Sequence, residues 1–352
     1  YNFEQGDLSM RKPNVAILGA TGAVGAEFIT LIEERNFPYE NLKLLASARS
    51  AGTELTVNGK TYVVEEAKPE SFANIDIALF AGGSISKTLA PEAAKRGAIV
   101  IDNSSAFRMD PEVPLVVPEV NPEDILKHKG IIANPNCSTI IMSLGLKPLH
   151  DISPIKRIVV STYQAVSGAG KEGIEELENQ VKQYTAGEEM TANLLPTGSA
   201  PKHYPVAFNL LPQIDVFLDN DYTKEEMKMV HETQKILHDD TIQVVPTTVR
   251  VPVYRSHSES VLVETEEPVS VEAFKAACEK FPGLQVKDNP AEQIYPMPLY
   301  TSNQNDCEIG RIRKDLYNDK GMNFWIVGDQ IRKGAALNAL QIAEYLVEKQ
   351  AF

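Results

Sequence analysis

The sequence predicts an α/β fold in two parts: a doubly wound parallel sheet, followed by a second α+β domain. Near-continuous apolar runs of strand length alternate with helical patterns over the first third of the chain. Beyond about residue 137 the runs lengthen, and several alternate apolar and polar residues, as in a sheet with one wet face. The 352 residues are also enough for two domains of ordinary size.

The first domain is expected to begin with a strand at residues 14–18, NVAIL, followed by the Gly-rich segment GATGAVG. Val24, Phe28, Leu31 and Ile32 then recur at helical spacing, which predicts a helix directly after the glycines. Further strands are predicted at 42–46, 75–80, 98–101 and 115–117, with a helix over 85–96.

The second domain is predicted to be an antiparallel sheet with helices. Its strands are expected at 156–164, 243–254, 260–264 and 322–327, and its helices at 170–183, 223–237 and 270–280. Either Asp221 or Thr223 is expected to cap the second of these helices. A last helix at 333–348 is expected to return to the first domain.

These elements divide the chain into 10–136 plus 328–352 for the first domain and 137–327 for the second. Residues 1–9 are polar and patternless, which is typical of a tag or a disordered tail.

Composition narrows the choice of partner and compartment. Thirty-four Lys and Arg against 48 Asp and Glu give a formal net charge of −14, which disfavours nucleic acid and anionic membrane surfaces as partners. Three cysteines are too few for a disulfide framework, and no apolar run is long enough to span a bilayer. A cytoplasmic protein is the expectation.

Gly19, Gly22 and Gly25 form G-x-x-G-x-x-G between the first strand and the first helix, a variant of the dinucleotide-binding fingerprint. Residues without Cβ allow a tight turn and let a pyrophosphate approach the N–H groups at the helix N-terminus. The alternative is an ordinary strand-to-helix turn.

The end of the second strand indicates which dinucleotide is bound. NAD sites usually place an acidic residue there, but this strand continues into Ser47, Arg49 and Ser50. A cation with hydroxyls suits a 2′-phosphate, so NADP is predicted over NAD. The alternative is a solvated surface arginine.

Cys137 is the candidate nucleophile. It lies in NPNCST, after the turn at Pro135 and at the start of an apolar helical run at 140–146. A helix N-terminus stabilises a thiolate, the reactive form of cysteine. The alternative is an inert core cysteine. Cys278, on an apolar helical face, and Cys307, in a polar loop, are interpreted as structural.

His257 is the candidate proton partner, because it follows a predicted strand and lies among hydroxyl residues. The other histidines are weaker candidates from their surroundings. They are His128, His150, His203, His231 and His238.

Seven segments together closely resemble the bacterial aspartate-β-semialdehyde dehydrogenases, over essentially the whole chain. They are GATGAVG, SARSAG at 47–52, DNSSAFR at 102–108, NPNCST, STYQAVSGAG at 161–170, EEMKM at 225–229 and VRVPVYRSHSES at 249–260. The resemblance implies a Rossmann-type NADP-binding domain joined to a glyceraldehyde-3-phosphate-dehydrogenase-like catalytic and dimerisation domain. It also implies an enzyme that reduces L-aspartyl-4-phosphate to L-aspartate-4-semialdehyde with NADPH, releasing phosphate. The reaction would serve lysine, threonine, methionine and diaminopimelate biosynthesis.

Carried over position by position, the resemblance implies a role for each matching residue. Cys137 would be the nucleophile, His257 the acid/base, and Gln164 would help hold the substrate. Arg250 would bind the substrate carboxylate and Glu225 its ammonium, while Arg108 and Lys228 would hold the phosphate. The residues implied on the cofactor side are Gly19, Thr21, Gly22, Ala23, Val24, Ser47, Arg49 and Ser50, with Ser167, Gly168 and Gln330 near the nicotinamide.

Alternatives to these roles stay open at the level of sequence. Glu225 and Lys228 are also compatible with a plain helix ion pair, and Arg108 with a surface residue. An N-acetyl-glutamyl-phosphate reductase would have the same architecture, but its uncharged substrate nitrogen needs no acid at Glu225. A non-catalytic NADP-binding relative is the other alternative. A homodimer or homotetramer is implied, and no spacing of His, Cys and Asp predicts a metal site.

Overall fold

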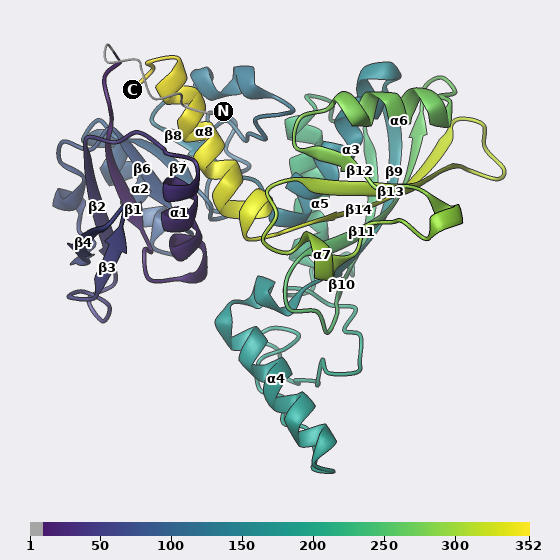
Figure 1. The fold of residues 1–352 in the computed structure, drawn as a ribbon, viewed down its shortest axis with the longest axis horizontal. Helices are drawn as coiled ribbons and strands as arrows, with labels where there is room; N and C mark the ends of the chain where they lie inside the picture. The colour runs from purple at the N-terminus through teal and green to yellow at the C-terminus, as the bar shows by residue number, and fades with distance from the viewer. Residues whose placement is uncertain (1–9) are drawn as a thin grey trace. The chain divides into compact units, whose positions relative to one another are not determined.

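The computed structural model describes residues 10–352, which form two compact units (Figure 1). The chain up to Asn136 and Gly334–Phe352 form the first unit, and Cys137–Lys333 forms the second. No helix in the described part of the chain is long and apolar enough to cross a membrane.

One stretch differs from the predicted division, and another is not tested. Residues 328–333, expected in the first domain, group with the second unit. The reason is local: Asp329 and Gln330 are hydrogen-bonded to Arg255 and Ser256 of that unit. The predicted tail at 1–9 lies outside the described residues.

The first unit is built on a six-stranded sheet with the order β5-β2-β1-β6-β7-β8. Its neighbouring strands pair in parallel, as the continuous apolar runs predicted. The strands are β1 Asn14–Leu18, β2 Asn41–Ala46, β5 Glu65–Glu66, β6 Ile77–Phe80, β7 Ile99–Asp102 and β8 Ile131–Ala133.

Both faces of this sheet are covered. Helices α1 (Ala23–Glu34) and α8 (Leu337–Glu348) share one apolar cluster, to which β1 contributes Val15 and Ile17. The alternate residues of β1 point to a second cluster on the other face, which contains apolar residues of α2 (Ser86–Lys95). The doubly wound arrangement is therefore confirmed, and the C-terminal helix belongs to the first unit (Figure 1).

The predicted strand at 115–117 is wrong, since only Leu115 forms an isolated bridge, to Ala133. The amide of Val117 donates instead to the side chain of Asn121, which turns the chain away. The strand that completes the sheet is β8, which the prediction missed. It also missed the hairpin of β3 (Glu54–Val57) and β4 (Lys60–Val63) and the short helices η1 (Pro69–Phe72) and η2 (Pro122–Lys127).

The second unit has a six-stranded sheet with the order β10-β9-β11-β14-β13-β12. The prediction of an antiparallel sheet is wrong at its two edges, because β10 pairs with β9, and β12 with β13, in parallel. The connection from β9 to β10 runs through two helices, so β10 enters in the same direction as β9. The strands are β9 Ile155–Gln164, β10 Gln243–Arg250, β11 His257–Thr265, β12 Leu284–Val286, β13 Cys307–Lys314 and β14 Gly321–Gly328.

Two strand boundaries differ from prediction in a way that bears on function. The predicted strand 243–254 ends at Arg250, and the predicted strand 260–264 begins earlier, at His257. His257 is therefore the first residue of β11, whereas the sequence suggested that it follows a strand.

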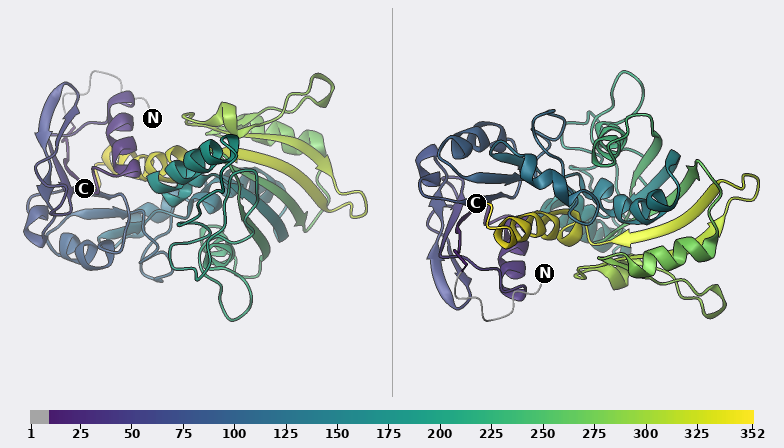
Figure 2. Two further views of the ribbon diagram at one scale, coloured as in Figure 1. Left: turned by 90° about the horizontal axis from the view of Figure 1, so that it is seen from below. Right: turned by 90° about the horizontal axis from the view of Figure 1, so that it is seen from above.

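Three helices pack against the second sheet: α3 (Cys137–Ile152), α5 (Lys224–Ile236) and α6 (Val271–Lys280). Figure 2 shows α6 running along the edge strands. Of the two predicted caps of α5, Thr223 is correct. The Thr223 hydroxyl accepts from the Glu226 amide, and the Glu226 carboxylate accepts from the Thr223 amide.

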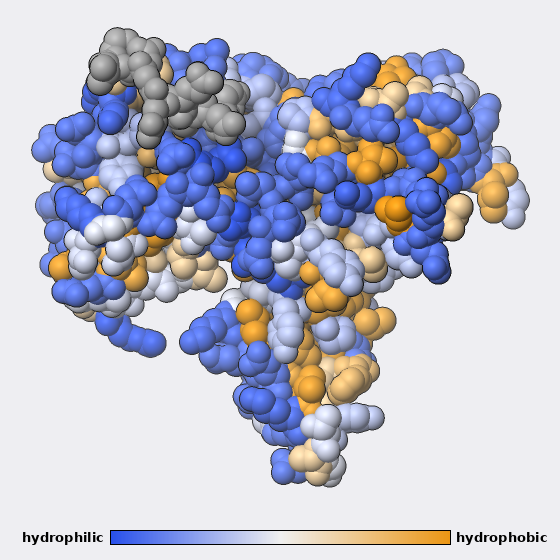
Figure 3. Space-filling view, in the orientation of Figure 1, coloured by the Kyte–Doolittle hydropathy of each residue, from blue (hydrophilic) through white to orange (hydrophobic). Residues whose placement is uncertain are grey.

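The fourth long helix, α4 (Lys171–Thr185), packs with the following segment in a separate apolar cluster. Along that segment apolar side chains also reach the surface, where orange and tan patches gather in the lower part of Figure 3. Phe208 is 64% exposed, Leu210 57% and Phe217 56%. The remaining short elements of the second unit are η3 Val166–Ala169, η4 Pro290–Glu292, α7 Pro298–Thr301 and η5 Arg332–Ala336, which continues into the first.

Candidate active site

Cys137 is the first residue of α3, as the sequence predicted, and its side chain is partly exposed. The helix runs to Ile152, so the full dipole of a long helix ends at this thiol and favours its anionic form. The other two cysteines are buried in the second unit, and burial raises the pKa of the Cys278 thiol to about 12. This supports their interpretation as structural residues.

Three neighbouring strands bring Gln164, Arg250 and His257 to one edge of the sheet. Arg250 and Gln164 are register partners at the ends of the parallel strands β10 and β9. His257 begins the antiparallel strand β11, whose next residue pairs with Tyr163 of β9. Gln164, Arg250 and His257 are far apart in the sequence, but they meet because β9 and β10 end where β11 begins.

Hydrogen-bond distances connect this group to α5. Gln164 Nε2 lies 3.4 Å from Glu225 Oε1 and 3.5 Å from His257 Nε2. The Gln164 side chain is itself fixed by a hydrogen bond, since its Oε1 accepts from the Thr162 hydroxyl at 2.8 Å. The amide is thus placed between an acidic and an imidazole side chain.

His257 is fully buried and has a defined tautomer. Its Nδ1 accepts from the Ala165 amide at 3.0 Å, so the proton of the neutral ring is on Nε2, the nitrogen near Gln164. Burial, and then the charge of Arg250, hold the pKa of His257 well below its usual range. At neutral pH the ring is uncharged and can donate from Nε2.

Arg250 is buried and only partly satisfied by the protein. Its Nη1 donates to the Ala165 carbonyl at 2.7 Å, but its buried Nε has no hydrogen-bond partner among the described residues. Burial lowers the pKa of Arg250, while the charges of Glu225 and Cys137 act in the opposite direction. A guanidinium held in this way is suited to a small anionic ligand.

Gly168 leaves room for these two groups. A Cβ at this position would lie 2.7 Å from Arg250 Nη1 and 3.3 Å from His257 Cε1. The absence of a side chain therefore keeps the space beside both residues open.

Glu225 and Lys228 form the expected i, i+3 pair on α5, at 3.6 Å. Lys228 also lies 3.5 Å from Asp215, which the sequence analysis missed. The plain ion pair is therefore present. It does not exclude a binding role, because Lys228 remains partly exposed.

Glu259 is a second acidic residue that the sequence analysis missed. It lies on β11 two positions after His257, so both side chains point to the same face of the sheet. Both carboxyl oxygens are buried without a hydrogen-bond partner among the described residues. Burial, and then the charge of Glu225, raise the pKa of Glu259 well above its usual range.

The glycine loop of the first unit has the features that a dinucleotide-binding turn needs. Gly19 has a φ of 83°, and a Cβ on Gly25 would lie 2.1 Å from the Gly19 carbonyl oxygen. Gly22 is the N-cap of α1 and has no capping side chain. Thr21, Gly22 and Ala23 are exposed at this helix start, with Val24 half-buried.

The other predicted cofactor residues are divided between the units. Ser47, Arg49 and Ser50 form the turn after β2 in the first unit, with Ser47 and Arg49 exposed. Ser167 and Gln330 lie in the second unit, as Gly168 does, and the Gln330 amide donates to the Ser167 hydroxyl.

Arg108 lies in the first unit and is held by the backbone. Its Nε donates to the Asn134 carbonyl at 2.9 Å, and its Nη2 to the Asn103 carbonyl at 3.0 Å. These two bonds fix the orientation of a planar guanidinium, whose geometry suits a phosphate.

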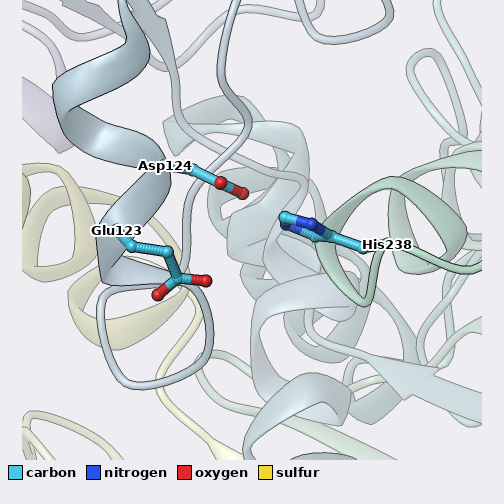
Figure 4. Close-up of side chains that lie close together, drawn as sticks. All are labelled: Glu123, Asp124 and His238. Carbon is cyan, nitrogen blue, oxygen red and sulfur yellow. The ribbon is translucent and has the colours of Figure 1, made fainter.

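Figure 4 shows Glu123, Asp124 and His238, which carry potential metal-ligating atoms. The two acids belong to η2 of the first unit, whereas His238 belongs to the second unit. Asp124 already accepts hydrogen bonds from Asn121 and Lys127. That the chain uses no metal stays a prediction.

Comparison with known proteins decides the family. The model of the semialdehyde dehydrogenase NAD binding domain matches residues 14–128, and that of the semialdehyde dehydrogenase dimerisation domain matches residues 146–333. The aspartate-semialdehyde dehydrogenase of Aquifex aeolicus is 56% identical, over 95% of this chain and 98% of that protein. The chain belongs to the aspartate-semialdehyde dehydrogenase family.

Other aspartate-semialdehyde dehydrogenases are also similar to this chain in sequence and in structure. The Bacillus subtilis enzyme is 52% identical over 95% of this chain and 97% of its own length. The crystal structure of aspartate semialdehyde dehydrogenase II from Vibrio cholerae, complexed with ASA, has a TM-score of 0.91. It is 46% identical and covers 97% of this chain and 100% of that one. The fold expected from the resemblance is confirmed.

Proposed function

We propose that this chain performs its aspartate-semialdehyde dehydrogenase reaction, an oxidoreduction of aspartate-family amino-acid biosynthesis, through a thioester on Cys137. The substrates would be L-aspartyl-4-phosphate and NADPH, and the products L-aspartate-4-semialdehyde, NADP and phosphate. The observation that carries the proposal is the buried Arg250, whose Nε lacks a partner in the described chain, in a group with Gln164, Glu225 and His257.

The charges of this group suit the ends of an amino-acid substrate. Arg250 would take the α-carboxylate, since its Nε is buried and unpartnered among the described residues. Glu225 is buried and would take the ammonium. Arg108 and Lys228 would take the phosphate, because both are cations whose side chains are oriented by protein contacts.

The bond changes follow from these placements. The Cys137 thiolate attacks the acyl carbon, the bond from that carbon to the phosphate oxygen breaks, and phosphate leaves. NADPH, when bound, supplies the hydride that reduces the thioester. His257 donates its Nε2 proton to the tetrahedral oxyanion and recovers it as the C–S bond breaks, which releases the aldehyde and restores the thiolate.

NADP rather than NAD is the proposed cofactor. The glycine loop fits a dinucleotide, because a Cβ on Gly25 would fill the turn that the pyrophosphate approaches. Arg49 and Ser47 are exposed after β2, where a 2′-phosphate would lie. In Arg49→Ala, we expect kcat/KM for NADP to fall while that for NAD is unchanged. An unchanged NADP/NAD ratio would contradict this assignment.

The reaction is best tested in the reverse direction, by following NADPH absorbance with aspartate semialdehyde, NADP and phosphate. We expect turnover that depends on phosphate, and none in Cys137→Ala. Mass spectrometry should find an acyl adduct on Cys137 when phosphate is omitted. Turnover without phosphate, or an active Cys137→Ala, would refute the proposal.

A second substrate distinguishes this enzyme from an N-acetyl-glutamyl-phosphate reductase. N-acetyl-glutamate semialdehyde has no ammonium for Glu225 to bind, so we expect no turnover with it. Glu225→Gln should raise KM for aspartate semialdehyde. If the acetylated substrate reacts as fast, the proposed role of Glu225 is wrong.

A homodimer formed through the second unit is the proposed assembly, since that unit matches a dimerisation domain and exposes Phe208, Leu210 and Phe217. Whether two dimers associate further is answered by analytical ultracentrifugation. The cytoplasm is the proposed location, because three cysteines are too few for the disulfide framework of a small secreted protein.

A further inference from the structure

The residue before His257 has an unusual backbone conformation. Ser256 has a φ of 78°, in the left-handed region that favours glycine, and it is 1% exposed. Such a conformation costs free energy and persists only where the surrounding contacts fix it. Since His257 follows directly, the contacts that fix Ser256 also set where the imidazole begins.

Ser256 is held on both its backbone and its side chain. Its amide donates to Gln330 Oε1 at 2.7 Å, and its hydroxyl accepts from Thr301 Oγ1 at 2.8 Å. The preceding carbonyl, of Arg255, accepts from the Ser302 hydroxyl at 3.1 Å. Two loops, one after α7 and one after β14, therefore meet at this residue.

Asp329 joins these two loops to Arg255. The carboxylate is fully buried, and its Oδ2 accepts from Arg255 Nε and from the Asn303 amide, both at 2.6 Å. Its Oδ1 accepts from the amides of Ile331 and Arg332. One side chain thus binds the segment before His257, the loop after α7, and the segment that carries Gln330.

The strand register places Asp329 close to the imidazole of His257. His257 of β11 pairs with Gly328, the last residue of β14, and Asp329 is the next residue along the chain. The Gln330 that accepts from the Ser256 amide also donates to Ser167. The hydrogen bonds around Ser256 therefore extend to Gln330 and Ser167, which we assign to the nicotinamide end.

We propose that Asp329 is a positioning residue for the reaction, which holds Ser256 in its left-handed conformation through Arg255 and thereby orients His257. The inference rests on the proposed role of His257. Asp329 itself contacts neither the substrate nor the reacting atoms in this scheme.

The test compares three variants in the full-length enzyme, with aspartate semialdehyde, NADP and phosphate as substrates. Asp329→Asn keeps one acceptor oxygen and turns the other into a donor, so it should release Arg255 or the Asn303 amide. We expect kcat to fall roughly 10- to 100-fold with KM for aspartate semialdehyde within about threefold of wild type, because misplaced catalytic groups lose rate. Adding Ser256→Gly should recover much of that loss, since glycine adopts this φ without help.

Asp288→Asn is the matched control. Asp288 is a buried carboxylate in the same unit that accepts from two backbone amides and pairs with Lys275 at 3.1 Å, away from the site. It should lose stability with kcat unchanged. An equal kcat loss in this control, a wild-type kcat in Asp329→Asn, or no recovery on adding Ser256→Gly would overturn the proposal.

Two further measurements keep the result decisive. If Asp329→Asn does not fold, Arg255→Gln removes the same contact from the other side and should give the same split between kcat and KM. A crystal structure of either variant should show Ser256 outside the left-handed region, whatever the enzyme's activity. A wild-type protein without phosphate-dependent turnover would refute the proposed function alone, while an unchanged Ser256 would refute the positioning role alone.

Discussion

Replacing Glu259 by glutamine should stabilise the protein increasingly as the pH rises. Both oxygens of this carboxyl are buried without a partner in the described chain, and burial together with Glu225 raises its pKa well above the ordinary value of 4.5. At a pH below the ordinary pKa, the carboxyl is protonated in the folded and unfolded states alike, so it contributes no pH dependence. At a pH between the ordinary and the raised pKa, the unfolded state loses the proton while the folded state keeps it.

The size of the effect follows from this proton difference. Each pH unit between the unfolded and folded pKa values lowers the free energy of unfolding by up to about 1.4 kcal/mol. The amide introduced by Glu259→Gln is an uncharged mimic of the protonated acid, so the variant escapes this loss. Its stability relative to wild type should therefore grow steadily from about pH 5 upward.

Urea denaturation at several pH values measures this difference, because urea does not screen charges. Trp325 is the only tryptophan of the chain and lies on β14, next to β11, so its fluorescence reports the unit that carries Glu259. Glu226→Gln is the control: this buried carboxylate accepts from the Thr223 and Thr248 amides, and the variant should be less stable than wild type. A difference that is constant with pH, or that falls as the pH rises, would refute the reasoning.

Three further predictions concern the thiols, the cofactor loop and the carboxylate site. Iodoacetamide at a mildly alkaline pH should label Cys137 in the native protein and leave Cys278 unmodified until urea is added. Peptide mass spectrometry would show which thiol is labelled. Labelling of Cys278 in the native protein would contradict its burial. Gly25→Ala should cost about 1–3 kcal/mol of stability and raise KM for the cofactor, whereas Gly198→Ala, where a Cβ meets open space, should do neither. Arg250→Lys should lower kcat/KM for aspartate semialdehyde roughly 10- to 100-fold, by the loss of a charged hydrogen bond; steady-state kinetics with an unchanged value would contradict the assignment.

Local patterns predicted the parts of the site that depend on local structure. The thiol at a helix start and the glycines between a strand and a helix are both visible in a short stretch of sequence, because each needs only the elements on either side of it. Cys137 and Gly19 were found in this way.

The remaining site depends on strand register, which no short stretch contains. Gln164 and Arg250 meet because β9 and β10 pair in parallel, and a prediction of an antiparallel sheet does not bring them together. Asp215 approaches Lys228 from a loop with no regular pattern. In each case the contact is fixed by long-range packing.

Glu259 could have been found from the sequence. A strand that starts at His257 places Glu259, Val261 and Val263 on one face with the imidazole by alternation. Two buried valines on that face then indicate that the acid is buried as well. The predicted strand starts instead at residue 260, which leaves the acid in a polar loop.

The net charge of −14 says little about the site, because burial decides which of its acids are charged. In the proposed mechanism Arg250 binds the substrate carboxylate, and an ionised Glu259 close to Glu225 would add a second negative charge near that ligand. Burial raises the pKa of Glu259 and so favours its neutral form. In the proposed mechanism, Glu225 would then be the acid that meets the ammonium, and the charge of Arg250 would stay available to the carboxylate. If those roles are correct, the stability that the folded chain is expected to lose at Glu259 as the pH rises is linked to how the site would separate the two charged ends of an amino-acid substrate.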